Sequence, residues 1–168
     1  MACLIFSNSL FSQELQKDGK LFLGANFGVG LGYHKAKGYS YSGGEGYMFA
    51  IPWESRTEKL PINAGLDVAY ETIDDIFVGA YSAIGTDFVK KDVQYLDLGA
   101  LLMIGLNDSY SLILGLGFHV IDYKYNGDNL RIGFLSPRNV YMMLEGNYNN
   151  YGSKSDASVL ISFGYRIF

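Results

Sequence analysis

The feature that most constrains the fold is a two-residue alternation of apolar with small or polar side chains, clearest in the last eleven residues, Ser158 to Phe168. The side chains at every second position are apolar: Val159, Ile161, Phe163, Tyr165 and Ile167. The positions between them hold Ser162, Gly164 and Arg166. Because successive side chains of a strand point to opposite faces, this segment predicts a strand with one apolar and one small or polar face. A barrel strand with lipid outside and a narrow polar lumen inside has this pattern.

The same alternation begins at Lys20. One face carries apolar side chains and the other is rich in glycine; the apolar face holds Leu21, Leu23, Ala25, Phe27, Val29, Leu31 and Tyr33. A run of about thirteen residues is long for a globular sheet, where five or six is usual. It suits a strand that crosses a membrane at a tilt.

Continuing along the chain, the alternation predicts eight strands, at about residues 20–33, 60–71, 76–86, 95–104, 110–120, 130–134, 140–148 and 158–167. The connections after strands two, four and six are short, at 72–75, 107–108 and 136–139. Those after strands one, three, five and seven are longer or more polar, at 34–58, 87–91, around Asn126-Gly127 and at 149–156. An even count with this asymmetry predicts an all-β fold, an eight-stranded antiparallel up-and-down transmembrane β-barrel spanning residues 20–168, with both ends of the barrel chain on the periplasmic side.

Composition narrows the function classes. There is no run of eighteen apolar residues, so the sequence predicts no transmembrane helix. A net charge of −4 without a basic cluster argues against nucleic acid as a partner. The single cysteine, Cys3, excludes an intramolecular disulfide and a multi-cysteine metal site. His34 has no partner at a metal-ligand spacing, and no glycine-rich run continues into Lys-Ser/Thr, so we expect neither a metal nor a cofactor.

Residues 1–19 form a separate N-terminal segment. Residues 2–12 are typical of the apolar end of a secretory signal, with Gln13 as the new N-terminus, although a basic leading region is missing. A short disordered or lumen-plugging segment is the alternative interpretation.

At this point the chain resembles the small eight-stranded outer-membrane barrels of the OmpA/OmpX type, from Lys20 to Phe168. The resemblance is most specific at the end, where Phe163, Tyr165 and Phe168 are similar to the C-terminal signal that the barrel-assembly machinery recognises in this class. The resemblance implies integral residence in a bacterial outer membrane, with membrane lipid, the assembly machinery and other envelope proteins as partners. One departure is that the terminal Phe of the class shares the outward phase, whereas here Ile167 does. This departure predicts a one-residue register shift or a bulge in the last strand.

Charged side chains on the inward phase form the first candidate site. We expect a lumen polar network of Lys20, Asp67, Glu71, Asp97, His119, Arg131, Glu145 and Arg166. Because the interior of an eight-stranded barrel is just wide enough to be filled by side chains, ion pairs that replace an apolar core are the preferred interpretation. An ion path or carboxylate catalysis is the alternative.

Two further features bear on function. Some eight-stranded barrels modify lipids with a His, a Ser and a carboxylate near the rim, but no Ser lies two residues after His119. The first long connection carries five aromatic residues, Tyr39, Tyr41, Tyr47, Phe49 and Trp53. They predict either a contact surface for a protein or sugar, or an extension of strands one and two in which the aromatic rings pack on one another.

The sequence therefore predicts a non-enzymatic outer-membrane barrel, with no catalytic, cofactor-binding or metal-binding residues, in a structural, surface-interaction or envelope-complex accessory role. Two alternatives remain open: a soluble lipocalin-like ligand carrier, which would be apolar inside, and a lipid-modifying outer-membrane enzyme.

Overall fold

The computed structural model describes residues 21–43, 49–89, 93–107, 110–121 and 125–168. Its strands are β1 (Leu21–Ser42), β2 (Phe49–Lys59), β3 (Pro61–Ile73), β4 (Ile76–Asp87), β5 (Gln94–Asn107), β6 (Tyr110–Ile121), β7 (Tyr125–Leu135), β8 (Val140–Tyr151) and β9 (Lys154–Arg166). Within these ranges no helix is long and apolar enough to cross a membrane.

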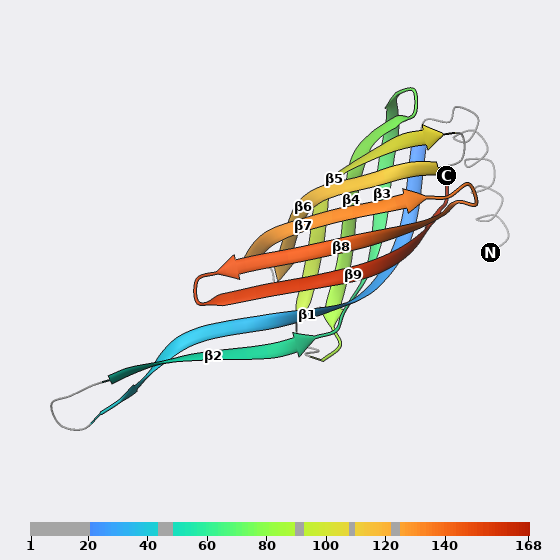
Figure 1. The fold of residues 1–168 in the computed structure, drawn as a ribbon. Coiled ribbons are helices and arrows are strands. Elements are labelled where there is room, and N and C mark those ends of the chain that lie inside the picture. Colours follow the sequence, from blue (N-terminus) through green and yellow to red (C-terminus); the bar gives the residue numbers. More distant parts are fainter. Residues whose placement is uncertain (1–20, 44–48, 90–92, 108–109, 122–124) are drawn as a thin grey trace, which may run out of the picture.

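Eight of the strands close the barrel predicted from the sequence (Figure 1). β3 to β8 each pair antiparallel with the next strand, and β1 pairs antiparallel with both β3 and β9. The turns at 74–75 and 136–139 mark one end of the barrel, which we call the turn end. β1 and β2 project from the other end, which we call the hairpin end.

β2 and β3 lie along β1 one after the other, with a break at Leu60. Residues 21–29 of β1 pair with β3, and residues 32–42 pair with β2. Asp87 satisfies the backbone at the break, because its Oδ1 accepts hydrogen bonds from the backbone N–H groups of Leu60 and Val89, each at 3.0 Å. The 22-residue β1 therefore belongs to the barrel at its start and to a separate hairpin at its end.

The outward face of the barrel is apolar, as the alternation predicts. The side chains assigned outward are exposed or partly exposed in every barrel strand; exposed examples are Phe27, Leu66, Ile84, Leu98, Leu116, Phe118, Ile132, Leu144 and Ile161. The residues assigned inward, such as Asp67, Tyr81, Asp97 and Glu145, are buried. A barrel with this polarity is stable where lipid surrounds it.

The interior has two layers rather than one polar network. An apolar layer fills the turn end with Phe22, Ala69, Leu101, Met103, Ile113, Leu135, Tyr141 and Met143, which form one buried cluster. The polar residues lie between this layer and the hairpin end. The expectation that ion pairs replace an apolar core was therefore wrong for the turn end of the lumen.

Three predictions of local structure were also wrong. Residues 34–58 are not an irregular loop, since β1 continues to Ser42 and pairs with β2. Asn126-Gly127 does not form the turn; both residues lie in β7, opposite Val120 and His119. Residues 149–156 are mostly strand, and a turn at Gly152, whose φ is +72°, joins β8 to β9. Because the turn between β8 and β9 is short, the β1–β2 hairpin is the one large extension at the hairpin end within the described residues.

The last strand keeps an unbroken register. β9 pairs with β1 and with β8 without a bulge, so the predicted shift does not occur. The strand ends at Arg166, and Phe168 lies beyond it. The Phe168 carbonyl accepts a hydrogen bond from the Arg166 Nε at 2.7 Å and another from the Leu23 backbone N–H at 3.3 Å. Phe168 is thus hydrogen-bonded to Leu23, near the start of β1, although it lies beyond the end of β9.

Candidate functional site

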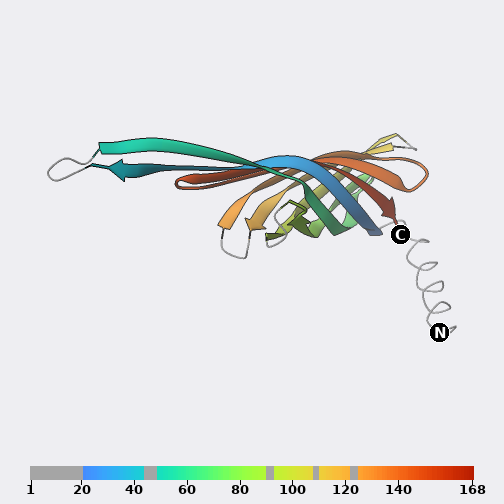
Figure 2. The same ribbon diagram turned by 90° about the horizontal axis from the view of Figure 1, so that it is seen from below.

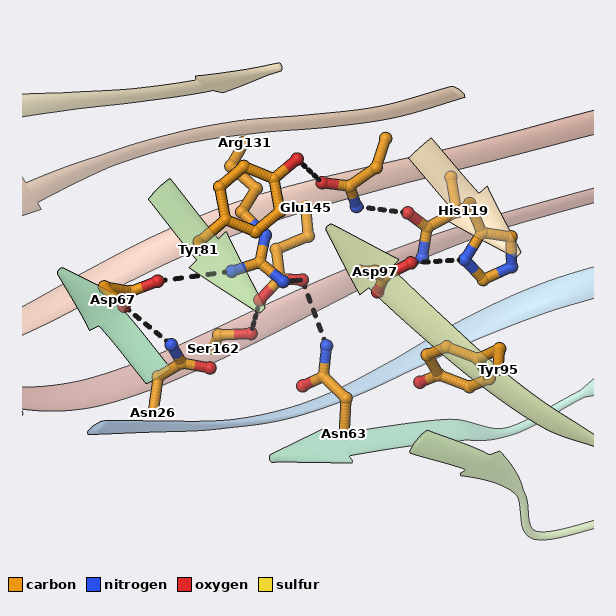
Figure 3. A network of polar contacts seen from close by, with 12 residues as sticks. Asn26, Asn63, Asp67, Tyr81, Tyr95, Asp97, His119, Arg131, Glu145 and Ser162 are labelled. Atoms are coloured by element: carbon orange, nitrogen blue, oxygen red, sulfur yellow. Dashed lines mark hydrogen bonds and ion pairs between the residues drawn. The ribbon is translucent and has the colours of Figure 1, made fainter. Parts of the chain in front are cut away.

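Arg131 is the centre of the lumen network (Figure 3). Its side chain, on β7, is 0% exposed. Its Nη1 lies 3.4 Å from Asp67 Oδ1 and its Nη2 lies 3.2 Å from Glu145 Oε2. The guanidinium also stacks over the Tyr81 ring, with 3.9 Å between Cζ and the ring centroid. A planar cation between two carboxylates and an aromatic face neutralises charge that would otherwise be buried unpaired.

Each carboxylate of this cluster has two further donors. Asp67 accepts hydrogen bonds from Asn26 Nδ2 at 2.7 Å and from the Tyr141 hydroxyl at 2.6 Å. Glu145 accepts hydrogen bonds from Asn63 Nδ2, at 3.0 Å, and from the Ser162 hydroxyl. Such donors compensate the desolvation of the two carboxylates.

A second pair lies nearer the hairpin end. Asp97 and His119 are fully buried and face each other from β5 and β6, with 2.5 Å between Oδ1 and Nδ1. The Tyr95 ring lies 5.0 Å from the imidazole. Hydrogen bonds from the Tyr81 hydroxyl to Asn129, and from Asn129 to Asn147, continue the polar layer across the lumen.

A third cluster at the mouth of the barrel was not predicted. Lys59, at the end of β2, forms a buried ion pair with Asp156 of β9, and Asp156 Oδ2 lies 3.3 Å from His34 Nδ1. His34 and Asp156 lie in segments predicted to be loops, and Lys59 lies between the predicted loop at 34–58 and the predicted strand that begins at Leu60. Their position in the alternation of the strands is the one sequence feature that would have predicted side chains on the lumen side.

The remaining residues of the predicted network lie elsewhere. Glu71 accepts a hydrogen bond from the backbone N–H of Asp75, in the turn after β3, at 3.1 Å. Arg166 lies at the turn end, 6.0 Å from the Phe22 ring. Lys20 is outside the described residues. Of the eight predicted members, Asp67, Arg131 and Glu145 meet in one cluster and Asp97 and His119 in another.

The chemistry open to this lumen is limited. Among the described residues no group of three His, Cys, Asp or Glu side chains could hold a metal ion. His119 is buried against Asp97 and Tyr95 rather than exposed at the rim, where a membrane lipid could reach it. The geometry is that of a packed polar core.

The β1–β2 hairpin is the second candidate site. It extends past the β8–β9 turn in both views (Figures 1 and 2). Residues directly opposite each other share a face, so Tyr39 and Tyr41 lie on one side with Lys37, whereas Trp53 lies on the other side over Gly38. Tyr39 and Tyr41 are 66% and 70% exposed.

The hairpin arrangement decides between the two interpretations of the aromatic segment only in part. The segment is an extension of the first two strands, as the second interpretation expected. Its rings do not all pack away, however, because Tyr39, Tyr41 and Trp53 remain exposed. Tyr47 lies outside the described residues, as does the side chain of Phe49.

Ion pairs and a cation–π contact join β1 and β2 at the base of the hairpin. Lys35 Nζ lies 2.5 Å from Glu54 Oε1, Lys37 Nζ lies 3.7 Å from Glu54 Oε2, and Arg56 lies 4.4 Å above the Tyr33 ring. The hydrogen bond from Lys35, followed by the charges of both lysines, holds the pKa of Glu54 below its ordinary value. These contacts cross from β1 to β2 and so favour the paired strands.

The residues of the predicted assembly signal lie at the turn end. Phe163 and Tyr165 point outward and are exposed on β9. Phe168 follows the strand and is partly buried. Recognition by an assembly machinery stays a prediction.

Comparison with known proteins identifies the fold. No protein-family model and no curated protein matches the chain. The solution structure of the de novo designed barrel TMB2.3 is similar with a TM-score of 0.50 at 14% identity, covering 90% of this chain and 98% of that one. The attachment invasion locus protein Ail of Yersinia pestis gives a TM-score of 0.45 at 15% identity, covering 86% and 98%. Neisserial surface protein A gives 0.38 at 11% identity, covering 85% and 99%.

The chain therefore has the fold of a small eight-stranded transmembrane β-barrel.

Proposed function

We propose that the chain is an integral, non-enzymatic outer-membrane barrel that presents the β1–β2 hairpin as a contact surface. The observation that carries this proposal is the inside-out polarity of a barrel whose one long extension, among the described residues, is an exposed hairpin bearing aromatic side chains. The outward belt of leucine, isoleucine, valine and phenylalanine suits lipid. A soluble lipocalin-like carrier would need the opposite polarity.

The packed lumen supports a role outside the barrel rather than through it. The apolar layer at the turn end and the Arg131 cluster occupy the interior from eight strands. A solute path along this axis would require displacing buried, mutually paired charges, which is costly. Catalysis is equally disfavoured, because His119 is enclosed.

The hairpin suits a contact role because its rings are presented rather than buried. Trp53 is 46% exposed although it packs over Gly38. Aromatic side chains dominate binding energy at protein interfaces and bring apolar area at low entropic cost. The partner belongs to the cell envelope or the cell exterior.

The membrane assignment is tested by refolding the chain from urea into detergent micelles and comparing boiled with unboiled samples on SDS gels. A closed barrel has no open edge and resists SDS until heated, so we expect a mobility shift on boiling. A chain that dissolves in plain buffer and shows no shift would overturn the assignment.

The contact role is tested with a hairpin deletion. Ala36 and Ser55 are cross-strand partners, so an Asn-Gly turn can join them and replace residues 37–54. The deleted variant keeps the β1–β9 pairing and should still shift on boiling. A photo-crosslinking residue at position 41 on intact cells should give an adduct, whereas one at position 138, in the turn between β7 and β8, should not. Absence of an adduct at position 41 would leave the hairpin without a contact role.

A further inference from the structure

The outer surface of β1, β8 and β9 carries a graded series of side chains toward the hairpin end. Along β1 the outward residues change from Leu31 to Tyr33 to Lys35, and then to Lys37. Along β9 they change from Val159 to Ala157 and then Ser155. Apolar, aromatic and cationic positions follow one another in the order in which a membrane lipid presents its acyl chain, interface and phosphate.

Two hollows follow this gradient and share Tyr33. The one nearer the apolar belt has a volume of about 500 Å³. Leu31, Tyr33, Ala157 and Val159 form its apolar side, and Arg56, Glu58, Lys59, Asn147 and Ser158 form its polar side. The one nearer the hairpin has a volume of about 310 Å³ and is lined by polar groups, including Lys35, Lys37, Asn150, Lys154 and Ser155. The outward-facing side chains of this groove are thus apolar in its lower part, at Leu31, Ala157 and Val159, and cationic in its upper part, at Lys35 and Lys37.

Ala157 creates the narrow part of this groove. It is directly opposite Tyr33 on one side and Tyr148 on the other, so a small side chain lies between two tyrosines. One row toward the turn end, the outward-facing Gly146 lies opposite Val159, and a Cβ there would meet nothing within 4 Å. The two small residues leave room for a chain of methylene groups beside the aromatic girdle.

The upper hollow has an excess of positive charge. Lys35 and Lys37 share one carboxylate, Glu54, so one lysine charge is not balanced by it. Lys37 is exposed, with 62% of its side chain accessible, and Lys154 lines the same hollow. Flexible ammonium groups with an amide and a hydroxyl nearby are suited to a phosphate oxygen.

We propose that this groove binds one phosphate-bearing membrane lipid, with an acyl chain beside Ala157 and the phosphate at Lys35 and Lys37. The inference rests on the proposed membrane residence. It adds a defined lipid site at the base of the hairpin, next to the exposed Tyr39 and Tyr41, which lie on the same side of β1 as Lys37.

The test measures lipid bound to the refolded full chain in a neutral detergent, by native mass spectrometry. The probes are dioleoyl phosphatidic acid, dioleoyl glycerol, which lacks only the phosphate, and inorganic phosphate. We expect phosphatidic acid to bind one to one, dioleoyl glycerol to bind at least tenfold more weakly, and inorganic phosphate at equal concentration not to displace the lipid. Displacement by inorganic phosphate would make the site one for a free anion and overturn the lipid assignment.

Two matched pairs of variants separate charge from shape. K37Q should weaken phosphatidic acid binding about fivefold, whereas R138Q, which removes one exposed charge at the turn end, should not. A157F closes the gap between the tyrosines and should weaken binding at least as much, whereas A100F, at an outward alanine of β5, should not. Equal binding by all four variants would refute the site.

The gel shift on boiling is recorded for every variant. If the wild-type chain shows no mobility shift on boiling, the proposed membrane residence is contradicted. If it shows the shift but binds no lipid selectively, only this lipid site is contradicted.

Discussion

Removing the Arg131 side chain should destabilise the barrel strongly, because two buried carboxylates lose their cation. The change R131M keeps much of the volume but takes the cation from between Asp67 and Glu145. Breaking a buried ion pair by removing one partner costs about 3–5 kcal/mol, because an uncompensated charge stays buried. Each carboxylate retains two hydrogen-bond donors, so we expect a loss of about 3 kcal/mol, at the lower end.

The assay is urea unfolding in detergent micelles, followed by the fraction of unboiled protein that migrates as a closed barrel. With a dependence of about 1–3 kcal/mol per molar urea, a loss of about 3 kcal/mol lowers the midpoint by about 1–3 M. The exposed turn residue Arg138 provides the control, since R138M should change the free energy of unfolding by less than about 0.5 kcal/mol.

A triple variant tests the cause. Combining R131M with D67N and E145Q removes the cation and both negative charges, so most of the lost stability should return. Two results would refute the reasoning: an R131M midpoint equal to that of the wild type, or a triple variant no more stable than R131M. The first would mean that the cluster contributes little, and the second that packing rather than charge sets the cost.

Two further outcomes follow from contacts described above. G164A should lower the free energy of unfolding by about 1–3 kcal/mol in the same urea assay, because its Cβ would lie 2.1 Å from the Tyr141 ring. G146A is the control and should leave the free energy of unfolding unchanged, because its Cβ would meet nothing within 4 Å. Equal midpoints for the two variants would contradict this. An NMR titration of the Glu54 carboxyl should give a pKa below its ordinary value of 4.5, and this pKa should rise in K35Q. The contact between Lys35 and Glu54 therefore stabilises the hairpin above pH 4.5, and this stabilisation is lost as the pH falls through the lowered pKa of Glu54. A pKa that is unchanged in K35Q would show that the lysine contact is absent in solution.

The barrel could be predicted from the sequence because its exterior is lipid-facing. An apolar side chain at every second position, as in Val159, Ile161 and Phe163, can only reflect one continuous apolar face. The turn end of the lumen could not be predicted in the same way. In Leu101, Leu102 and Met103 both faces are apolar, since one meets lipid and the other packs inside, and the alternation disappears.

The strand bounds and register of the hairpin could not be predicted, for the opposite reason. Above Tyr33 both faces of β1 meet water or charge, so Lys35, Ser40 and Gly38 follow no hydrophobic period. Its pairing depends on cross-strand partners that are not visible in a single strand. The Lys59–Asp156 pair was lost with it, because burial at that position depends on where the barrel mouth closes.

The closing seam between β1 and β9 has a consequence for how the protein is made. Every other barrel pairing joins strands that lie next to each other along the barrel part of the chain, but this one brings Ala25 against Tyr165. The partner of the first barrel strand is therefore the last barrel strand to leave the ribosome. Until then the edges of β1 and of the growing sheet are open, which is the condition under which strands aggregate. Closure therefore follows the synthesis of β9, and until then the nascent strands must be kept from other open edges.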